Sequence, residues 1–472
     1  MLQTTAPKIQ PPRVAAPGKA RSHRHRLATA ASQPLHPAQP GERVPLDATP
    51  RPCDESHVIT EEDATRRTLR NELWRSLPAG VIDTLTATFG MLIAVRVFHM
   101  DAVAKSVFLS AASGGLVASL FIVPLLLRAR STIARTAAKV QLLGGACMAV
   151  SASFPSHALL FIVGMSLGLF CFTLQIPLMT QIYRINYPAV IRGKLYAITG
   201  VTRAVAAMGF GFFGGKLLGW DISHYHWLLW AFAACGFISG LWTYHLPNTD
   251  WEPAAASSSR LWSALRWVRE DHDFRTLLIS WMIMGIGNLA AACLFVEYLA
   301  NPAHGIDLPE FQVAWVTGVV PVFSRILFSY PWGLIYDRFH LFTVRAVLNV
   351  FFAAGILCFY LGHSLFWWTL GMALWGVANA GGNVTWALWV TKLAPKHAVA
   401  EYMSVHTFLT GLRGLIAPSL AFAMIKVMSF DTFAIICGLT ILSASGFLGV
   451  RAHTSDPTTS DRLKPGARPE RL

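Results

Sequence analysis

Long apolar stretches constrain this chain more than any other feature of its sequence. Several blocks run roughly 18 residues or more with one charged residue or none, which is the length a helix needs to cross a bilayer. Lipid offers the backbone no hydrogen-bond partner, so such blocks must be helices. Charged residues make up only 14% of the chain, against about 25% in soluble domains. We therefore predict an all-α integral membrane protein.

Twelve such blocks follow one another and divide into two groups of six. They lie near residues 76–98, 104–127, 136–154, 156–181, 194–218, 226–246, 276–299, 311–335, 343–361, 364–390, 401–424 and 430–450. A long basic segment separates the two groups, and its apolar residues recur at the spacing of an amphipathic surface helix. The predicted order is a tail (1–59), an interfacial amphipathic helix (60–75), a six-helix bundle (76–246), a linker (247–275), a second six-helix bundle (276–450) and a tail (451–472).

The net charge of +14 is distributed unevenly between the two sides of the predicted membrane. Loops on one side carry Arg128, Arg130, Arg135, Lys139, Arg184, Arg192, Lys194, Arg260, Arg266, Arg269, Arg275, Arg338, Arg345, Lys392 and Lys396. The opposite side carries Lys105, Lys216 and Lys426, all at span edges. Lys and Arg accumulate in cytoplasmic loops, so we expect both termini in the cytoplasm and the spans in a bacterial inner (plasma) membrane. This distribution indicates that the positive charge orients the protein in the membrane. The alternative explanation is that the basic tails bind nucleic acid.

One loop supports a more specific interpretation. Residues 333–338 read Gly-Leu-Ile-Tyr-Asp-Arg, and Arg345 follows. This order resembles the Gly-x-x-x-Asp-Arg loop signature of the major facilitator superfamily, although positions 340–342 depart from it. The resemblance implies a fold of two pseudo-symmetric six-helix bundles. It also implies that Gly333, Asp337, Arg338 and Arg345 form a cytoplasmic gate, with a solvated loop as the alternative.

Three arginines lie deep in predicted spans. Arg203 and Arg413 occupy equivalent spans of the two halves, roughly 15–18 Å from the cytoplasmic end at about 1.5 Å per residue, and Arg325 lies in span 8. The deep acids are Asp83 and Glu297. Ionisable residues at mid-membrane are functional candidates, and this excess of arginine predicts an anionic substrate held by two hydrogen bonds per guanidinium. The alternative is that the arginines pair with these acids or with carbonyls and only hold the bundles together.

The resemblance further implies that spans 1, 4, 7 and 10 line a central cavity. Polar and aromatic residues occur there: Gln175 in span 4, Asn288 in span 7, and Asn379, Asn383 and Trp386 on one face of span 10. Aromatic walls with a few amides suit a small polar solute. Buried amide bonds between packed helices are the alternative.

These features predict a secondary active transporter that moves a small solute, with an organic anion as the candidate, by alternating access. We expect a monomeric symporter or antiporter whose partners are lipid, the solute and protons, with Asp83 and Glu297 as proton carriers. The sequence has no phosphate-binding loop, metal-ligand cluster or nucleophile triad, so we expect no cofactor, metal or enzyme activity. A proton-coupled drug or metabolite exporter is one alternative. A sensor or enzyme on the same scaffold is another, but its only tight group, Glu401, Tyr402 and His406, is interpreted as a helix start.

Overall fold

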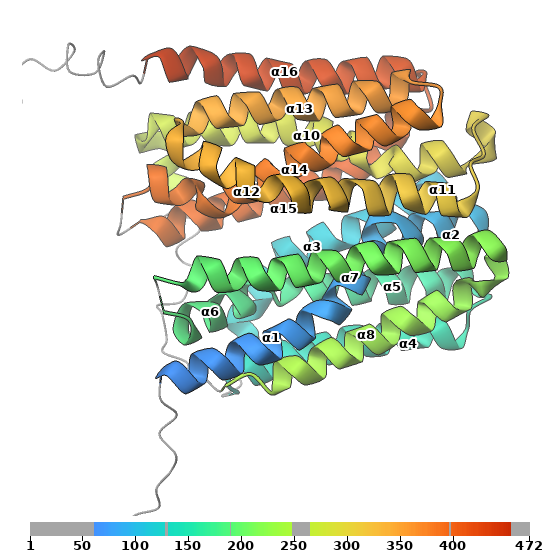
Figure 1. The fold of residues 1–472 in the computed structure, drawn as a ribbon, viewed down its shortest axis with the longest axis horizontal. Coiled ribbons are helices and arrows are strands. Elements are labelled where there is room, and N and C mark those ends of the chain that lie inside the picture. The colour runs from blue at the N-terminus through green and yellow to red at the C-terminus, as the bar shows by residue number, and fades with distance from the viewer. Residues whose placement is uncertain (1–60, 128–130, 189, 248–264, 396–397, 455–472) are drawn as a thin grey trace, which may run out of the picture. The chain divides into compact units, whose positions relative to one another are not determined.

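The computed structural model describes residues 61–127, 131–188, 190–247, 265–395 and 398–454. All regular structure in these ranges is helical (Figure 1). The first predicted tail, the second one beyond residue 454, and most of the predicted linker lie outside the described residues, as do the basic loop residues Arg128, Arg130, Arg260 and Lys396.

Chain order divides the helices into an earlier and a later half. The earlier half comprises α1 (Glu61–Thr84), η1 (Leu85–Phe89), α2 (Gly90–Arg96), α3 (Ala102–Leu127), α4 (Ile133–Ser153), α5 (Ala158–Leu174), α6 (Ile176–Asn186), α7 (Arg192–Trp220), η2 (Ile222–His224) and α8 (Tyr225–Tyr244). The later half comprises α10 (His272–Ala300), η3 (Pro302–His304), α11 (Glu310–Ala314), η4 (Trp315–Val319), α12 (Val320–Arg338), α13 (Leu341–Leu361), α14 (Leu365–Leu393), α15 (Val399–Met424) and α16 (Phe430–Thr454). We call these halves the first and the second bundle.

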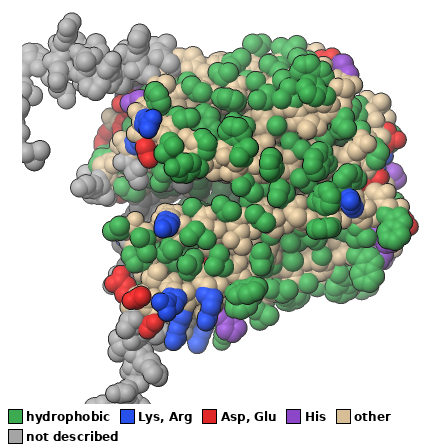
Figure 2. Space-filling model, in the orientation of Figure 1, with side chains coloured by type: hydrophobic (Ala, Val, Ile, Leu, Met, Phe, Trp, Pro, Cys, Tyr) green, Lys and Arg blue, Asp and Glu red, His purple; other side chains and the backbone are tan. Residues whose placement is uncertain are grey.

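Most of the helices are built for a membrane. Within the described residues, 10 helical runs are long and apolar enough to span one, and α4 and α14 add helices of 21 and 29 residues. Figure 2 shows hydrophobic side chains over the middle of the visible face, with charged side chains gathered at its two ends. The predicted all-α membrane fold is confirmed, while the number of twelve spans stays a prediction.

The first helix turns its polar side toward the bundle. α1 runs without a break through the position where we expected an interfacial helix to end. Arg75 donates to both carboxylate oxygens of Glu72 at 2.7 and 2.5 Å, and the amide of Asn71 donates to the His245 carbonyl at 2.6 Å. These side chains are buried, whereas Trp74 is 52% exposed. A buried charge is tolerated when it is paired and hydrogen-bonded, so this network allows the polar face to point inward.

The two bundles meet mainly where α3 packs on α15 and where α7 packs on the α11–η4–α12 run (Figure 1). α2 also contacts α10, and η1 contacts η4. Small residues allow the contact: a Cβ on Gly215 would lie 2.6 Å from the Ala314 Cβ, and one on Gly411 would lie 2.5 Å from Val117 Cγ2. The start of α1, the end of α8, the start of α10 and the end of α16 lie on the same face. We call this face the linker side and the opposite one the far side.

Two π-helical turns lie where the bundles touch. η1 interrupts the helical run that begins with α1, and η4 interrupts the run that ends with α12. The hydroxyls of Thr88 in η1 and Thr317 in η4 are hydrogen-bonded at 3.1 Å. Single π-helical turns inside α-helices are frequent at functional sites. The Thr88–Thr317 hydrogen bond thus joins the two bundles near the middle of these two helical runs.

Candidate substrate cavity and its arginines

A buried ion pair joins the bundles on the far side. Lys105 of α3 donates to both carboxylate oxygens of Glu297 in α10, at 2.8 Å each. Both side chains are buried, and the Asn301 amide donates to the same carboxylate at 2.7 Å. The structure therefore places Glu297, expected as a proton carrier, in a contact between the bundles.

A second far-side contact involves Arg96, at the end of α2. Its guanidinium binds the Asp307 carboxylate, donates to the Leu308 carbonyl at 2.7 Å and lies 3.8 Å from a Glu310 carboxylate oxygen. Sequence reasoning missed Arg96 because the residue lies at the edge of an apolar block.

The contacts between the bundles are confined to one part of the interface. Among the described residues, every hydrogen bond and ion pair between them lies between the Thr88–Thr317 contact and the far side. Figure 2 shows the surface hollowed between the two halves at the linker side, at the left of the view. The bundles are therefore joined on the far side and separated on the linker side.

Arg203 of the first bundle is neutralised by an acid. Its Nε and Nη2 donate to the two carboxylate oxygens of Asp83 at 2.6 Å each, and each of the two side chains is 36% exposed. The guanidinium carbon also lies 5.2 Å from the centre of the Phe172 ring. A two-bond arginine–carboxylate pair is among the stronger ionic contacts in proteins. For this arginine the structure shows the bracing arrangement.

Arg325 faces this pair from the second bundle. The side chain is half-buried on α12 and interacts electrostatically with both Asp83 and Arg203. Within the described residues its guanidinium makes no hydrogen bond or ion pair. The single carboxylate of Asp83 therefore lies near two guanidinium groups, those of Arg203 and Arg325. The three side chains together carry a net positive charge.

Arg413 has no acidic partner within the described part of the chain. Its Nη1 donates to the backbone carbonyl of Trp281, and its buried Nε has no partner. A Cβ on Gly285 would lie 2.2 Å from Nη1, so the glycine on α10 provides the room that the guanidinium occupies. The arginine is half-buried.

Arg345 lies beside Arg413 and not with the loop residues with which we grouped it. It is 3% exposed, its Nη2 lies 3.8 Å from the Met284 sulfur, and its guanidinium carbon lies 5.0 Å from the centre of the Trp281 ring. Its Nε is buried without a partner, and it interacts electrostatically with Arg413. Sequence reasoning placed it at the membrane surface because it opens a helix, although that helix starts inside the bundle.

The remaining gate residues are not engaged in this arrangement. A Cβ on Gly333 would meet nothing within 4 Å, so no helix packs closely there. Asp337 and Arg338 are exposed, and neither makes a side-chain hydrogen bond or ion pair within the described ranges. Their role as a brace stays a prediction for another arrangement of the bundles.

His406 belongs to the arginine cluster. It is 1% exposed, its ring centre lies 4.1 Å from that of Trp281 and 5.2 Å from that of Trp389, and its Nε2 is buried without a partner. The helix start to which we assigned it is a separate feature, in which the Tyr402 hydroxyl donates to Asp271 at 2.6 Å. The sequence signal was the spacing: His406 and Arg413 are seven residues apart, on one face of α15.

The predicted cavity amides fall into two groups. Asn288 accepts from the Trp375 indole at 2.9 Å, and the Asn379 amide donates to the Trp375 carbonyl at 2.8 Å. Asn383 and Trp386, further along α14, are exposed, and the Trp386 ring centre lies 6.0 Å from that of His406. Of these residues, Asn288 belongs to α10 and the others belong to α14.

Gln175 is placed differently from the other amides. It is buried in the first bundle, where its amide nitrogen donates to the Gln141 side chain of α4. The contact joins two helices of the same bundle, which is the helix-packing arrangement.

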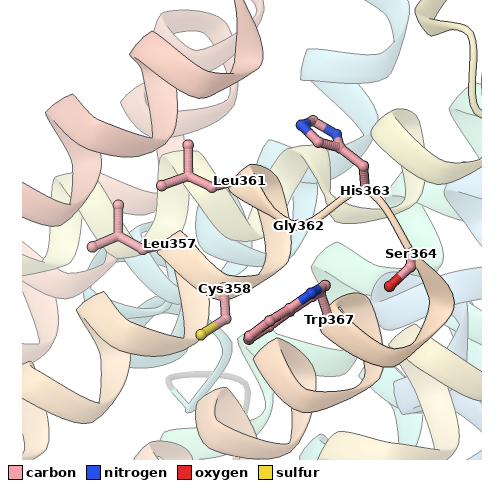
Figure 3. A pocket seen from close by; sticks show the side chains of 7 residues that line it. All are labelled: Leu357, Cys358, Leu361, Gly362, His363, Ser364 and Trp367. Atoms are coloured by element: carbon pink, nitrogen blue, oxygen red, sulfur yellow. The ribbon is translucent and has the colours of Figure 1, made fainter.

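Two surface pockets lie away from the arginines. One, of about 660 Å³, lies at the turn between α13 and α14, where Trp367 and His363 flank Gly362 (Figure 3). The other, of about 480 Å³, lies on the linker side between Trp267 and Tyr402. Neither is lined by a deep arginine, and the described residues contain no cluster of His, Cys, Asp and Glu that could hold a metal.

Comparisons of the whole chain with known proteins match at the level of structure. No protein-family model and no curated protein matches the sequence. Similar solved structures include the nucleoside transporter NupG (TM-score 0.64, 15% identity, 82% of this chain and 99% of that one) and a D-xylose–proton symporter (0.58, 13%, 82% and 96%). The human organic anion transporter MFSD10 is also similar (0.54, 14%, 81% and 99%). The chain therefore has the fold of the major facilitator superfamily of membrane transporters.

Proposed function

We propose that this protein is a secondary active transporter that moves a small organic anion across the membrane by alternating access. The observation that carries the proposal is the pair of guanidinium groups of Arg345, which is buried, and Arg413, which is half-buried: neither has an acidic partner among the described residues. Removing a charge from water without a partner costs several kcal/mol, so these groups favour an incoming negative charge. Arg203 is less suited to bind an anion because Asp83 already occupies it.

The arrangement of the bundles supports the mechanism. Ion pairs at Glu297 and Arg96 join them on the far side, and the surface between them is hollow on the linker side. This arrangement matches one end state of a transporter in which two halves rock around a central site. The basic loops favour a cytoplasmic linker side, and with that orientation this state opens inward. The far-side ion pairs must then break for the outward-open state to form.

The fold by itself leaves the class of solute open. Similar structures include a nucleoside transporter, a symporter of D-xylose and protons, and an organic anion transporter. The unpaired arginines favour the anion among these classes. Proton coupling can use Asp83, since protonation would release Arg203, or Glu297, since protonation would release Lys105.

A direct test begins by identifying the solute. An untargeted metabolite comparison between a null strain and an overexpressing strain names candidates, and uptake into proteoliposomes containing the purified protein then measures each one. We expect saturable uptake of an anion that other anions inhibit and uncharged analogues of the same size do not. An imposed pH gradient should drive this uptake if protons are the coupling ion.

Substitutions of the deep arginines test whether their guanidinium groups bind the anion. We expect Arg413→Gln to lower kcat/KM by about 100-fold, equivalent to roughly 2.7 kcal/mol, through loss of a charged hydrogen-bond donor. Arg70→Gln, which changes an exposed arginine on α1, is the matched control and should transport normally. Uptake confined to uncharged solutes, or normal uptake by both Arg203→Gln and Arg413→Gln, would contradict the proposal.

A further inference from the structure

We infer that the charged part of the substrate is held entirely within the second bundle, between Arg345, Arg413, His406 and Asn349. We also infer that it carries two negative charges, on one group as in a phosphate monoester or on two groups as in a dicarboxylate. The inference rests on the proposed function and specifies its site and the class of anion.

Unpartnered polar atoms are concentrated at this place. The Nε atoms of Arg345 and Arg413, Nε2 of His406, and both amide atoms of Asn349 are buried without a hydrogen-bond partner. Asn349 is fully buried and lies one turn after Arg345 on α13. More than about 90% of buried polar groups in folded proteins have a partner. The two arginine Nε atoms and the Asn349 amide nitrogen are donors, so this concentration indicates that a ligand with several acceptor oxygens belongs here.

The charge at the site matches a dianion. Arg345 and Arg413 are close enough to interact electrostatically, and within the described residues no acid pairs with either of them. Glu297 is held in the far-side ion pair, and Glu401 lies 3.9 Å from a basic side chain at the linker end. Two guanidinium groups without a counter-charge repel each other, and a ligand with two negative charges removes both the repulsion and the desolvation penalty.

Trp281 positions both guanidinium groups. Its ring lies under Arg345 and its backbone carbonyl accepts from Arg413, so one residue of α10 orients cations from α13 and α15. Gly285, one turn further along α10, leaves the space that Arg413 occupies. Arg413 is half-buried and Trp386 is 36% exposed, so the site is accessible from the side where α14 and α15 carry these two residues.

Ligand-dependent thermal stability tests the inference on the purified full-length protein in nanodiscs. The ligands are phenyl phosphate and succinate as dianions, benzoate and acetate as monoanions, and benzyl alcohol as an uncharged analogue. We expect a dianion to raise Tm at concentrations about tenfold or more below those that a monoanion requires, because each additional charged contact strengthens binding by about this factor. If phenyl phosphate raises Tm, the ligand is a phosphate monoester; if succinate raises it, the ligand is a dicarboxylate.

Substitutions then locate the binding. Arg345→Gln should abolish the preference for dianions, Arg345→Lys should keep part of it, and the control Arg70→Gln should keep all of it. Asn349→Leu, which keeps the number and branching of the side-chain heavy atoms, should weaken binding severalfold. This variant provides the test if Arg345→Gln does not fold. Equal responses to dianions and monoanions, or unchanged dianion binding in Arg345→Gln or Asn349→Leu, would overturn the inference.

Transport separates this inference from the proposed function. If Arg345→Gln takes up the anionic substrate with an unchanged KM, the site is wrong while the transporter proposal stands. If the wild-type protein takes up only uncharged solutes, the proposed function itself fails.

Discussion

Arg203 in the first bundle and Arg413 in the second occupy equivalent spans at similar depth, yet their surroundings differ. Arg203 makes a two-bond ion pair with Asp83, whereas Arg413 donates to a backbone carbonyl and lies beside a second unpaired arginine. Equivalent positions in a repeated architecture therefore serve different purposes. The neutral pair suits a structural contact, and the uncompensated pair suits the binding of an anion.

Two glycines show the same contrast between a structural role in the first bundle and a functional role in the second. A Cβ on Gly80 of α1 would lie 2.1 Å from the backbone oxygen of Arg203, so that glycine lets two helix backbones touch. A Cβ on Gly285 of α10 would instead meet the guanidinium tip of Arg413. In the first bundle the missing side chain allows helix packing, and in the second it accommodates a functional group.

The largest effect should come from giving Arg345 an acidic partner of its own. In Met284→Glu a carboxylate replaces the sulfur that now lies 3.8 Å from Arg345 Nη2. We expect anion uptake to fall by about 100-fold, roughly 2.7 kcal/mol, because the built-in carboxylate competes with the substrate for the guanidinium. Proteoliposome uptake measures the loss. Met284→Gln has the same size without the charge and should retain uptake, and equal losses in both variants would show that shape and not charge is responsible.

A smaller effect should distinguish the two glycines. Gly80→Ala forces apart the backbones of α1 and α7, and we expect the free energy of unfolding to fall by about 1–3 kcal/mol. Gly285→Ala should reduce stability less, because the flexible tip of Arg413 can move, while its KM for the anion should rise. Thermal unfolding followed by tryptophan fluorescence and uptake kinetics provide the two measurements. Equal destabilisation with an unchanged KM would remove the distinction between the glycines.

The smallest effect should come from unpairing Arg203. Asp83→Asn leaves this guanidinium without its counter-ion, and we expect a loss of stability of about 1 kcal/mol, since the pair is more than a third exposed. The double variant Asp83→Asn/Arg203→Gln should recover most of that loss. Arg345→Gln should not lower Tm in the absence of anion, because it removes a charge that has no acidic partner among the described residues. A fall in Tm as large as that of Asp83→Asn would show that Arg345 is compensated after all.

The positions of single charged residues were predictable from the sequence, but their partners were not. The depth of Arg203 and of Arg413 followed from counting residues along a helix. The pairing of Arg203 with Asp83, one of the alternatives considered, required the approach of α1 to α7. Arg345 and His406 were assigned to a gate and to a helix start, because helix periodicity gives no information about the helix that a side chain faces.

The sequence by itself determined that this chain is an all-α membrane protein with deep arginines, since helices are the way an apolar segment satisfies its backbone in lipid. Only the tertiary structure decided which arginines are neutralised. Asp83 and Arg203 are 120 residues apart, and Trp281 and Arg413 are 132 apart. Their contacts depend on how separate helices pack. Packing places one acid within reach of Arg203 and, in the part of the chain that the structure describes, none within reach of Arg345 and Arg413.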